Sequence, residues 1–322
     1  MRSPILHNLG IPVNYLQLAF GFFLLVAGGE GLVRGAVSAA NRLGVSPLLI
    51  GLTLVGFGTS TPELVTSLQA ALNGLPGIAV GNVVGSNIAN ILLILGVAAI
   101  ISPITVARSG FGRDGAALAI STLLCVGVVL HGALDRWLGG VLIAALATYL
   151  VVTYLTDRSD TPDLAASTSP TLGPLWLAIT MILGGIAMTI FGARLAVDAA
   201  VTLALLWGMS ETVVGLTIVA VGTSLPELVT SVMAALRREP AIAFGNVVGS
   251  NIYNILGILG ITALVRPIAV PAQIAQFDVW LMAAATLALI IAVVPWQRIG
   301  RSIGLAFISA YTGYTAWLVT FA

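Results

Sequence analysis

The segment GTSTPELVTS, residues 58–67, places a glutamate inside a run of residues that is otherwise apolar. Pro62 has no N–H group, so the carbonyl of Gly58, four residues earlier, loses its helical hydrogen-bond partner. Thr59 and Glu63 are also four residues apart and would share one face of a helix. Carboxylate, hydroxyl and freed carbonyl oxygens are ligands for a hard cation such as Ca²⁺ or Na⁺. The segment contains none of the Cys or His ligands that favour zinc or copper.

The same phrase returns as GTSLPELVTS at residues 222–231, after a shift of 164 residues. A charged glutamate inside a membrane costs several kcal/mol unless something pairs with it. If the two copies meet, the charges of Glu63 and Glu227 repel each other unless a cation or a proton neutralises them. One Ca²⁺ balances two carboxylates, so the repeat predicts the two halves of a divalent-cation site. The simpler alternative for a single motif is a Pro-kinked helix with a protonated glutamate, and the matching second copy argues against it.

A second motif, GNVVGSNIAN at residues 81–90, also has a mate, GNVVGSNIYN at residues 245–254. Its glycines are spaced as in the small-residue pairs that let membrane helices approach closely. Within each copy, a serine and an asparagine four residues apart face the same way; they are Ser86, Asn90, Ser250 and Asn254. These side chains would either bind an ion or hydrogen-bond across helices, and the sequence leaves both roles open.

The composition places these motifs in a membrane. Of the 322 residues, 58% are hydrophobic and 8% are charged, and the mean hydropathy is +1.08. Soluble domains carry about 25% charged residues, so a soluble enzyme is excluded. A net charge of +1 and the lack of any basic run also exclude nucleic acid as a partner, which leaves the lipid bilayer.

A helix needs roughly 20 apolar residues to cross the bilayer. We therefore predict an all-α polytopic protein with ten transmembrane helices, at about 14–39, 46–73, 77–101, 115–131, 136–155, 174–200, 211–236, 241–265, 276–295 and 301–320. A polar stretch at 156–173 reads as a linker between a first half, 1–155, and a second half, 174–322.

The two halves are copies of one unit. Residues 45–106 align with 209–270 without gaps, and 38 of these 62 positions are identical. Five spans per copy is an odd number, so the second copy must enter the membrane inverted. Nine of the 13 Arg residues fall on the side of the odd-numbered loops, which predicts that the linker is cytoplasmic and that both termini lie outside. Inverted repeats with broken helices at the bilayer midplane are typical of secondary transporters.

The paired motifs resemble the two alpha-repeats of the calcium/cation antiporter superfamily, and most closely those of its prokaryotic sodium/calcium exchangers. The resemblance covers the whole chain. It implies alternating access in a cell (inner) membrane, with Na⁺ or H⁺ moving against Ca²⁺ through overlapping sites. Ca²⁺ and Na⁺ would be transported substrates, and no cofactor is implied.

The resemblance also implies specific ligands. It assigns Ca²⁺ to the carboxylates of Glu63 and Glu227 and the carbonyls of Thr59 and Thr223. It assigns Na⁺ to hydroxyls and carbonyls of Ser60, Ser224, Ser86, Ser250, Gly56 and Ala220. Some relatives, including the potassium-dependent branch, carry Asp where this chain has Asn254, and the equivalent residue of the first copy is Asn90.

Two other functions compete with Na⁺/Ca²⁺ exchange. Proton-coupled relatives usually have a GNxxE phrase where this chain has GTSxPE, which favours Na⁺ over an H⁺/Ca²⁺ antiporter without excluding it. An intramembrane enzyme using Glu63 is more remote, because His7 and His131 are distant from both motifs in the sequence. We therefore predict a transporter and not an enzyme.

Overall fold

The structure is a computed structural model, and it describes residues 4–106, 108–159, 173–208, 220–272 and 274–321. The described residues are mostly helical, with four strands of two residues each; in the labels, η denotes a π-helical segment. The elements of the first half are α1 (Pro4–Leu43), α2 (Pro47–Ile50), η1 (Gly51–Val55), α3 (Gly56–Thr59), α4 (Thr61–Leu72), α5 (Pro76–Ala89), η2 (Asn90–Leu95), α6 (Gly96–Ile101), β1 (Ile104–Thr105), α7 (Arg108–His131), β2 (Ala133–Leu134) and α8 (Arg136–Ser159). The elements of the second half are α9 (Leu175–Leu206), α11 (Ala220–Gly222), α12 (Leu225–Leu236), α13 (Pro240–Ile252), η4 (Tyr253–Leu259), α14 (Gly260–Val265), β3 (Ile268–Ala269), η5 (Ile274–Asp278), α15 (Val279–Trp296), β4 (Arg298–Ile299) and α16 (Arg301–Phe321).

Seven stretches among the described residues are long and apolar enough to cross a membrane, or eight if one bent pair counts as a single span. Helices α1 and α9 are longer than the predicted spans 14–39 and 174–200, because a helix continues past the end of an apolar run when its backbone hydrogen bonds allow. The start of the predicted span 211–236 and most of the predicted linker 156–173 lie outside the described residues. The number ten remains a prediction.

Several predicted spans are interrupted. The predicted span 46–73 passes through η1 and then bends by 44° between α3 and α4, where Ser60 leaves the helical conformation. The predicted spans 77–101 and 241–265 each contain a π-helical segment, η2 or η4, that begins at the end of the second motif. π-Helical turns are rare and occur frequently at functional sites.

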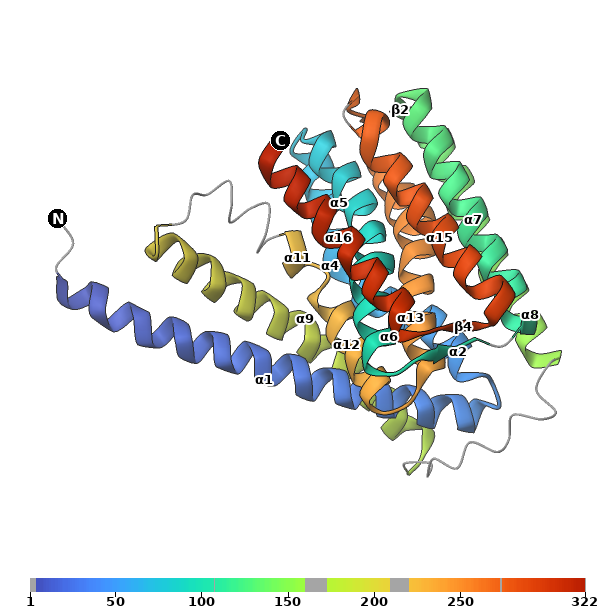
Figure 1. Ribbon diagram of the computed structural model, residues 1–322, viewed down its shortest axis with the longest axis horizontal. Coiled ribbons are helices and arrows are strands. Elements are labelled where there is room, and N and C mark those ends of the chain that lie inside the picture. Colours follow the sequence, from blue (N-terminus) through green and yellow to red (C-terminus); the bar gives the residue numbers. More distant parts are fainter. Residues whose placement is uncertain (1–3, 107, 160–172, 209–219, 273, 322) are drawn as a thin grey trace.

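Figure 1 shows α1 and α9 as two long helices that run beside each other along one side of the bundle. They cross antiparallel on glycines. A Cβ added to Gly28 would lie 2.9 Å from the carbonyl oxygen of Gly185. A Cβ added to Gly21 would lie 2.8 Å from the carbonyl oxygen of Gly192. Residues 21 and 28 become 185 and 192 under the 164-residue shift, so each glycine contacts the counterpart of the other. Such exchanged contacts are the pattern of a twofold axis.

A similar exchange recurs in the short strands and in one pair of threonines. Ile104 of β1 pairs antiparallel with Ile299 of β4, and Ile268 of β3, the counterpart of Ile104, pairs with Leu134 of β2. The hydroxyls of Thr122 and Thr286, which are 164 residues apart, lie 3.2 Å from each other. The strands were not predicted, because each pair joins segments more than 100 residues apart.

Candidate functional site

The broken helices place both glutamates in the first turn of a new helix. Ser60 has φ −80° and ψ 10°, and Ser224 has φ −89° and ψ 9°, so each interrupts the helix before it restarts as α4 or α12. The proline that follows is tolerated in a first helical turn, where its missing N–H would have no intrahelical partner. Glu63 and Glu227 come next, at the positive end of the helix dipole, which favours a carboxylate.

The two motifs are joined crosswise through these glutamates. Ser60 donates its hydroxyl to Oε1 of Glu227 at 2.8 Å, and Ser224 donates to Oε1 of Glu63 at 3.2 Å. Each glutamate is 1% exposed. Because each serine lies only three residues before the glutamate of its own motif, these two bonds bring both carboxylates to one buried place. The predicted pairing of the copies is therefore seen in the hydrogen bonds.

Both carboxylates keep an oxygen that no hydrogen bond satisfies. Oε2 of Glu63 and Oε2 of Glu227 are buried without a partner, and the ion pairs found among the described residues involve neither side chain. A buried carboxylate without a pairing charge is costly, so the arrangement calls for a cation or a proton. Groups of three or more Cys, His, Asp or Glu that could hold a resident metal are absent from the described residues.

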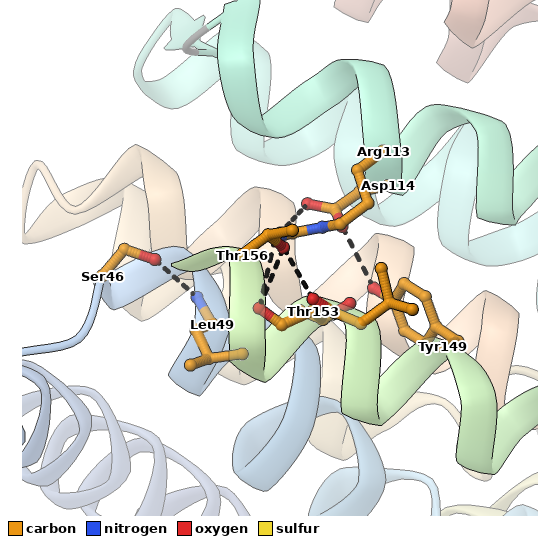
Figure 2. A network of polar contacts seen from close by, with 8 residues as sticks. Ser46, Leu49, Arg113, Asp114, Tyr149, Thr153 and Thr156 are labelled. Atoms are coloured by element: carbon orange, nitrogen blue, oxygen red, sulfur yellow. Dashed lines mark hydrogen bonds and ion pairs between the residues drawn. The ribbon is translucent and has the colours of Figure 1, made fainter. Parts of the chain in front are cut away.

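Asp114 provides a contrast within the same protein. Its carboxylate is also fully buried, but Arg113 donates to it from Nε at 2.7 Å and from Nη2 at 3.1 Å. Figure 2 shows that Arg113 also reaches Thr156 and that Tyr149 approaches Asp114, which ties the start of α7 to α8. Here the charge is neutralised by the fold, whereas at Glu63 and Glu227 it is not.

Two asparagines of the second motif hold the backbone of the glutamates. Asn82 donates to the carbonyl of Glu63 at 3.0 Å and to the hydroxyl of Ser67 at 2.9 Å. Asn246 does the same to Glu227 at 3.1 Å and to Ser231 at 2.9 Å. Our prediction of the site omitted Ser67 and Ser231. The signal was available, because both serines are retained in the two copies of GTSxPELVTS.

The predicted carbonyl and hydroxyl ligands lie around the break. The Thr59 hydroxyl is fully buried and lies 3.0 Å from the carbonyl of Val55 and 3.1 Å from Oδ1 of Asn246. Ser250 donates to the Gly56 carbonyl at 3.1 Å, so that carbonyl lies at the contact between the two motifs. In the second half, Ala220, the counterpart of Gly56, begins α11, which packs against α5.

The remaining predicted residues lie at the π-helical segments. Asn90 donates to Asn251 at 2.9 Å and leaves its own Oδ1 without a partner, while neither amide atom of Asn254 has one. Ser86 is buried one turn before Asn90. The segment η2 packs against α12, which carries Glu227, and η4 packs against α4, which carries Glu63. Unsatisfied amide oxygens near the carboxylates can serve either of the two predicted roles.

A cavity of about 400 Å³ reaches the broken motifs from one side. It lies between α4 and α9, and its lining includes Pro62 and Thr223. Thr223 is half-buried there, whereas its counterpart Thr59 is fully buried. Charged side chains from α9, Arg194 and Asp198, also line the cavity.

Comparisons with known proteins agree with this architecture. The chain is 34% identical to the sodium/calcium exchanger MaX1 of Methanosarcina acetivorans over 342 residues, covering 94% of this chain and 98% of that protein. It is 34% identical to the inner membrane protein YrbG of Escherichia coli (strain K12) over 316 residues, covering 94% of each. The solved structure of the sodium-calcium exchanger NCX_Mj superposes with a TM-score of 0.81 at 31% identity, covering 96% of this chain and 99% of that one.

The family profile described as sodium/calcium exchanger protein matches residues 13–155 and 177–320. The matched ranges contain both pairs of motifs. The relatives are transporters, not enzymes, which agrees with a site built of oxygen ligands and helix breaks. The chain is a transmembrane cation antiporter and belongs to the sodium/calcium exchanger family.

Proposed function

We propose that this protein exchanges Na⁺ for Ca²⁺ by alternating access. The observation that carries the proposal is the crosswise bonding of Ser60 to Glu227 and of Ser224 to Glu63, with one oxygen of each carboxylate left unsatisfied. A divalent ion between the two carboxylates leaves no net charge in the site. The names of MaX1 and NCX_Mj as sodium/calcium exchangers support the same choice of substrates.

In this proposal Ca²⁺ binds to Glu63 and Glu227 with help from the carbonyls of Thr59 and Thr223. Na⁺ uses the carboxylates too, together with oxygens of Ser60, Ser224, Ser86, Ser250, Gly56 and Ala220, while Asn90 and Asn254 complete the polar wall. A serine hydroxyl that donates to a carboxylate still has lone pairs for a cation. Because the two ions share carboxylates, they cannot occupy the site fully at the same time.

We further propose that the chain crosses a cell (inner) membrane ten times, as two inverted five-helix halves, 1–155 and 174–322, with breaks near the midplane. The exchanged contacts of α1 with α9 and the Thr122–Thr286 pair support the twofold relation. The name of YrbG as an inner membrane protein supports the location. With the linker 156–173 in the cytoplasm, as the distribution of Arg indicates, the cavity at Thr223 opens outward.

The test is Ca²⁺ uptake into proteoliposomes that contain the purified protein. A higher Na⁺ concentration inside the liposomes than outside is expected to drive Ca²⁺ uptake. Na⁺ added outside is expected to raise the apparent Kd for Ca²⁺. A pH gradient that drives uptake without Na⁺, together with a Kd unaffected by Na⁺, would instead establish the H⁺/Ca²⁺ antiporter. Liposomes without protein provide the leak rate.

A further inference from the structure

The two halves differ in how their long helix meets the other half. On one side, α1 packs closely on α12: an added Cβ on Gly29 would lie 3.1 Å from both Val229 and Met233. The residues at the corresponding positions, 164 residues away, are Ala193 of α9 and Val65 and Gln69 of α4. All three counterparts line the cavity of about 400 Å³. One contact is thus closed while its counterpart is open.

An ion pair lies at the end of α12 in the closed contact, and the described residues of the open contact form no equivalent. Glu30 of α1 accepts from Nε of Arg237 at 2.8 Å, a second nitrogen of Arg237 contacts its other carboxylate oxygen, and Arg34 pairs with it as well. Arg237 directly follows α12, so the ion pair joins the two elements that form the closed contact.

The repeat offers no matching ion pair on the open side. The counterparts of Glu30 and Arg34 are Arg194 and Asp198, and both line the cavity. The counterpart of Arg237 is Asn73, which is neutral. A bond like that between Glu30 and Arg237 therefore cannot form between α9 and the end of α4.

We propose that the Glu30–Arg237 ion pair is a lock that holds α1 against α12 and keeps one access route closed while the route between α4 and α9 is open. This inference rests on the proposed alternating access. Because the lock exists on one side only, it biases the two otherwise similar halves toward the conformation seen here. Opening the closed route requires the Glu30–Arg237 bonds to break.

The experiment compares matched thiol reporters at counterpart positions, Gln69→Cys in the cavity and Met233→Cys in the closed contact, in a Cys125→Ala background. The reaction rate of each is measured with an uncharged, water-soluble maleimide on detergent-solubilised protein, which exposes both sides. Cys at position 69 is expected to react faster. Arg237→Asn is expected to shift the equilibrium between the two conformations by about two- to fivefold, the range of partly exposed ion pairs. The rate at 233 then rises and the rate at 69 falls, and the two fold-changes multiply to that factor.

The control is Arg238→Asn, which removes the same charge one residue away. Arg238 has φ 59°, a left-handed conformation that asparagine adopts readily, so the backbone tolerates the change. It is expected to leave both rates unchanged. Glu30→Gln should reproduce the effect of Arg237→Asn, and the double variant should add nothing further.

A faster rate at position 233 in Arg237→Asn that Glu30→Gln does not reproduce would mean local loosening and would overturn the lock, as would a faster rate at 69 or equal effects of Arg237→Asn and Arg238→Asn. The measurement does not use transport. If Arg237→Asn changes the two rates as expected but the protein does not exchange Na⁺ for Ca²⁺, the proposed function is refuted and the lock stands. If gradient-driven exchange occurs but the two rates do not change as expected, the lock is refuted and the proposed function stands.

Discussion

Glu63 and Asp114 are both carboxylates buried inside a helical membrane protein, and their surroundings give them different roles. Asp114 has an arginine beside it in the sequence and two hydrogen bonds from that arginine. Glu63 receives one serine hydroxyl from the other half of the chain and leaves Oε2 without a partner. We therefore expect Asp114 to stabilise the structure and Glu63 to bind the transported ion.

Glu63→Gln and Glu227→Gln are each expected to abolish gradient-driven Ca²⁺ uptake and leave thermal stability unchanged or higher. The physical reason is that each change removes half of the charge that balances Ca²⁺ and also relieves repulsion between two buried carboxylates. Uptake and the melting temperature are measured on the same preparations. Near-normal uptake by either variant would remove the shared site from consideration.

Asp114→Asn is expected to have the opposite effect. It leaves Arg113, which is 18% exposed, without its carboxylate, at a cost of about 1–3 kcal/mol, somewhat less than the loss of a partner in a fully buried pair. The melting temperature should fall, while Ca²⁺ uptake per folded molecule should persist. A stable variant that no longer transports Ca²⁺ would instead assign Asp114 to the transport path.

At the scale of elements, close helix crossings hold the broken motifs in register. An added Cβ on Gly249 of α13 would overlap the carbonyl oxygen of Leu52 in η1, eight residues before the helix break at Ser60. Since that neighbour is backbone, a side chain cannot move aside to make room. The contact holds the second motif of one half against the helical segment that leads into the first motif of the other.

Gly249→Ala is therefore expected to destabilise the protein by about 1–3 kcal/mol, the usual cost of overpacking, and to lower Ca²⁺ affinity. Gly127→Ala in α7 is the matched control, because no described atom lies within 4 Å of an added Cβ there. Thermal unfolding and Ca²⁺ binding are measured for both variants. Equal tolerance of the two changes would show that the crossing does not set the site geometry.

At the scale of the whole molecule, we expect charge and not packing to set the orientation in the membrane. A twofold-related fold packs equally well either way up, whereas Arg residues concentrate in cytoplasmic loops. The duplicated loops have diverged in this respect: Asn73 and Gly74 of the first copy correspond to Arg237 and Arg238 of the second. This divergence favours a cytoplasmic position for the odd-numbered loops.

A cysteine at Ser167, in the linker, is expected to be shielded from an impermeant thiol reagent in intact cells, in a Cys125→Ala background. A cysteine at Ala322, the last residue, is expected to react. Labelling of both after the cells are opened serves as the control for accessibility. The reverse pattern would invert the proposed topology and place the cavity at Thr223 on the cytoplasmic side.

The sequence by itself determined the class of protein and the repeat, and it predicted the candidate site residues. Composition separates membrane from soluble chains because the bilayer excludes charge, and a 164-residue shift exposes the duplicated motifs directly. The pairing of Glu63 with Glu227 was predictable because symmetry and charge balance both require it. Helix lengths were less predictable, since hydropathy marks the apolar core and not the ends of α1 and α9.

Only the tertiary structure decided which groups bond to which. The crosswise serine–carboxylate bonds and the Thr59–Asn246 contact join residues more than 150 positions apart, where spacing carries no information. It also decided that equivalent surfaces differ, since Gly29 packs on Met233 while their counterparts Ala193 and Gln69 line a cavity. A duplicated sequence predicts two similar halves, but the structure packs their equivalent surfaces differently.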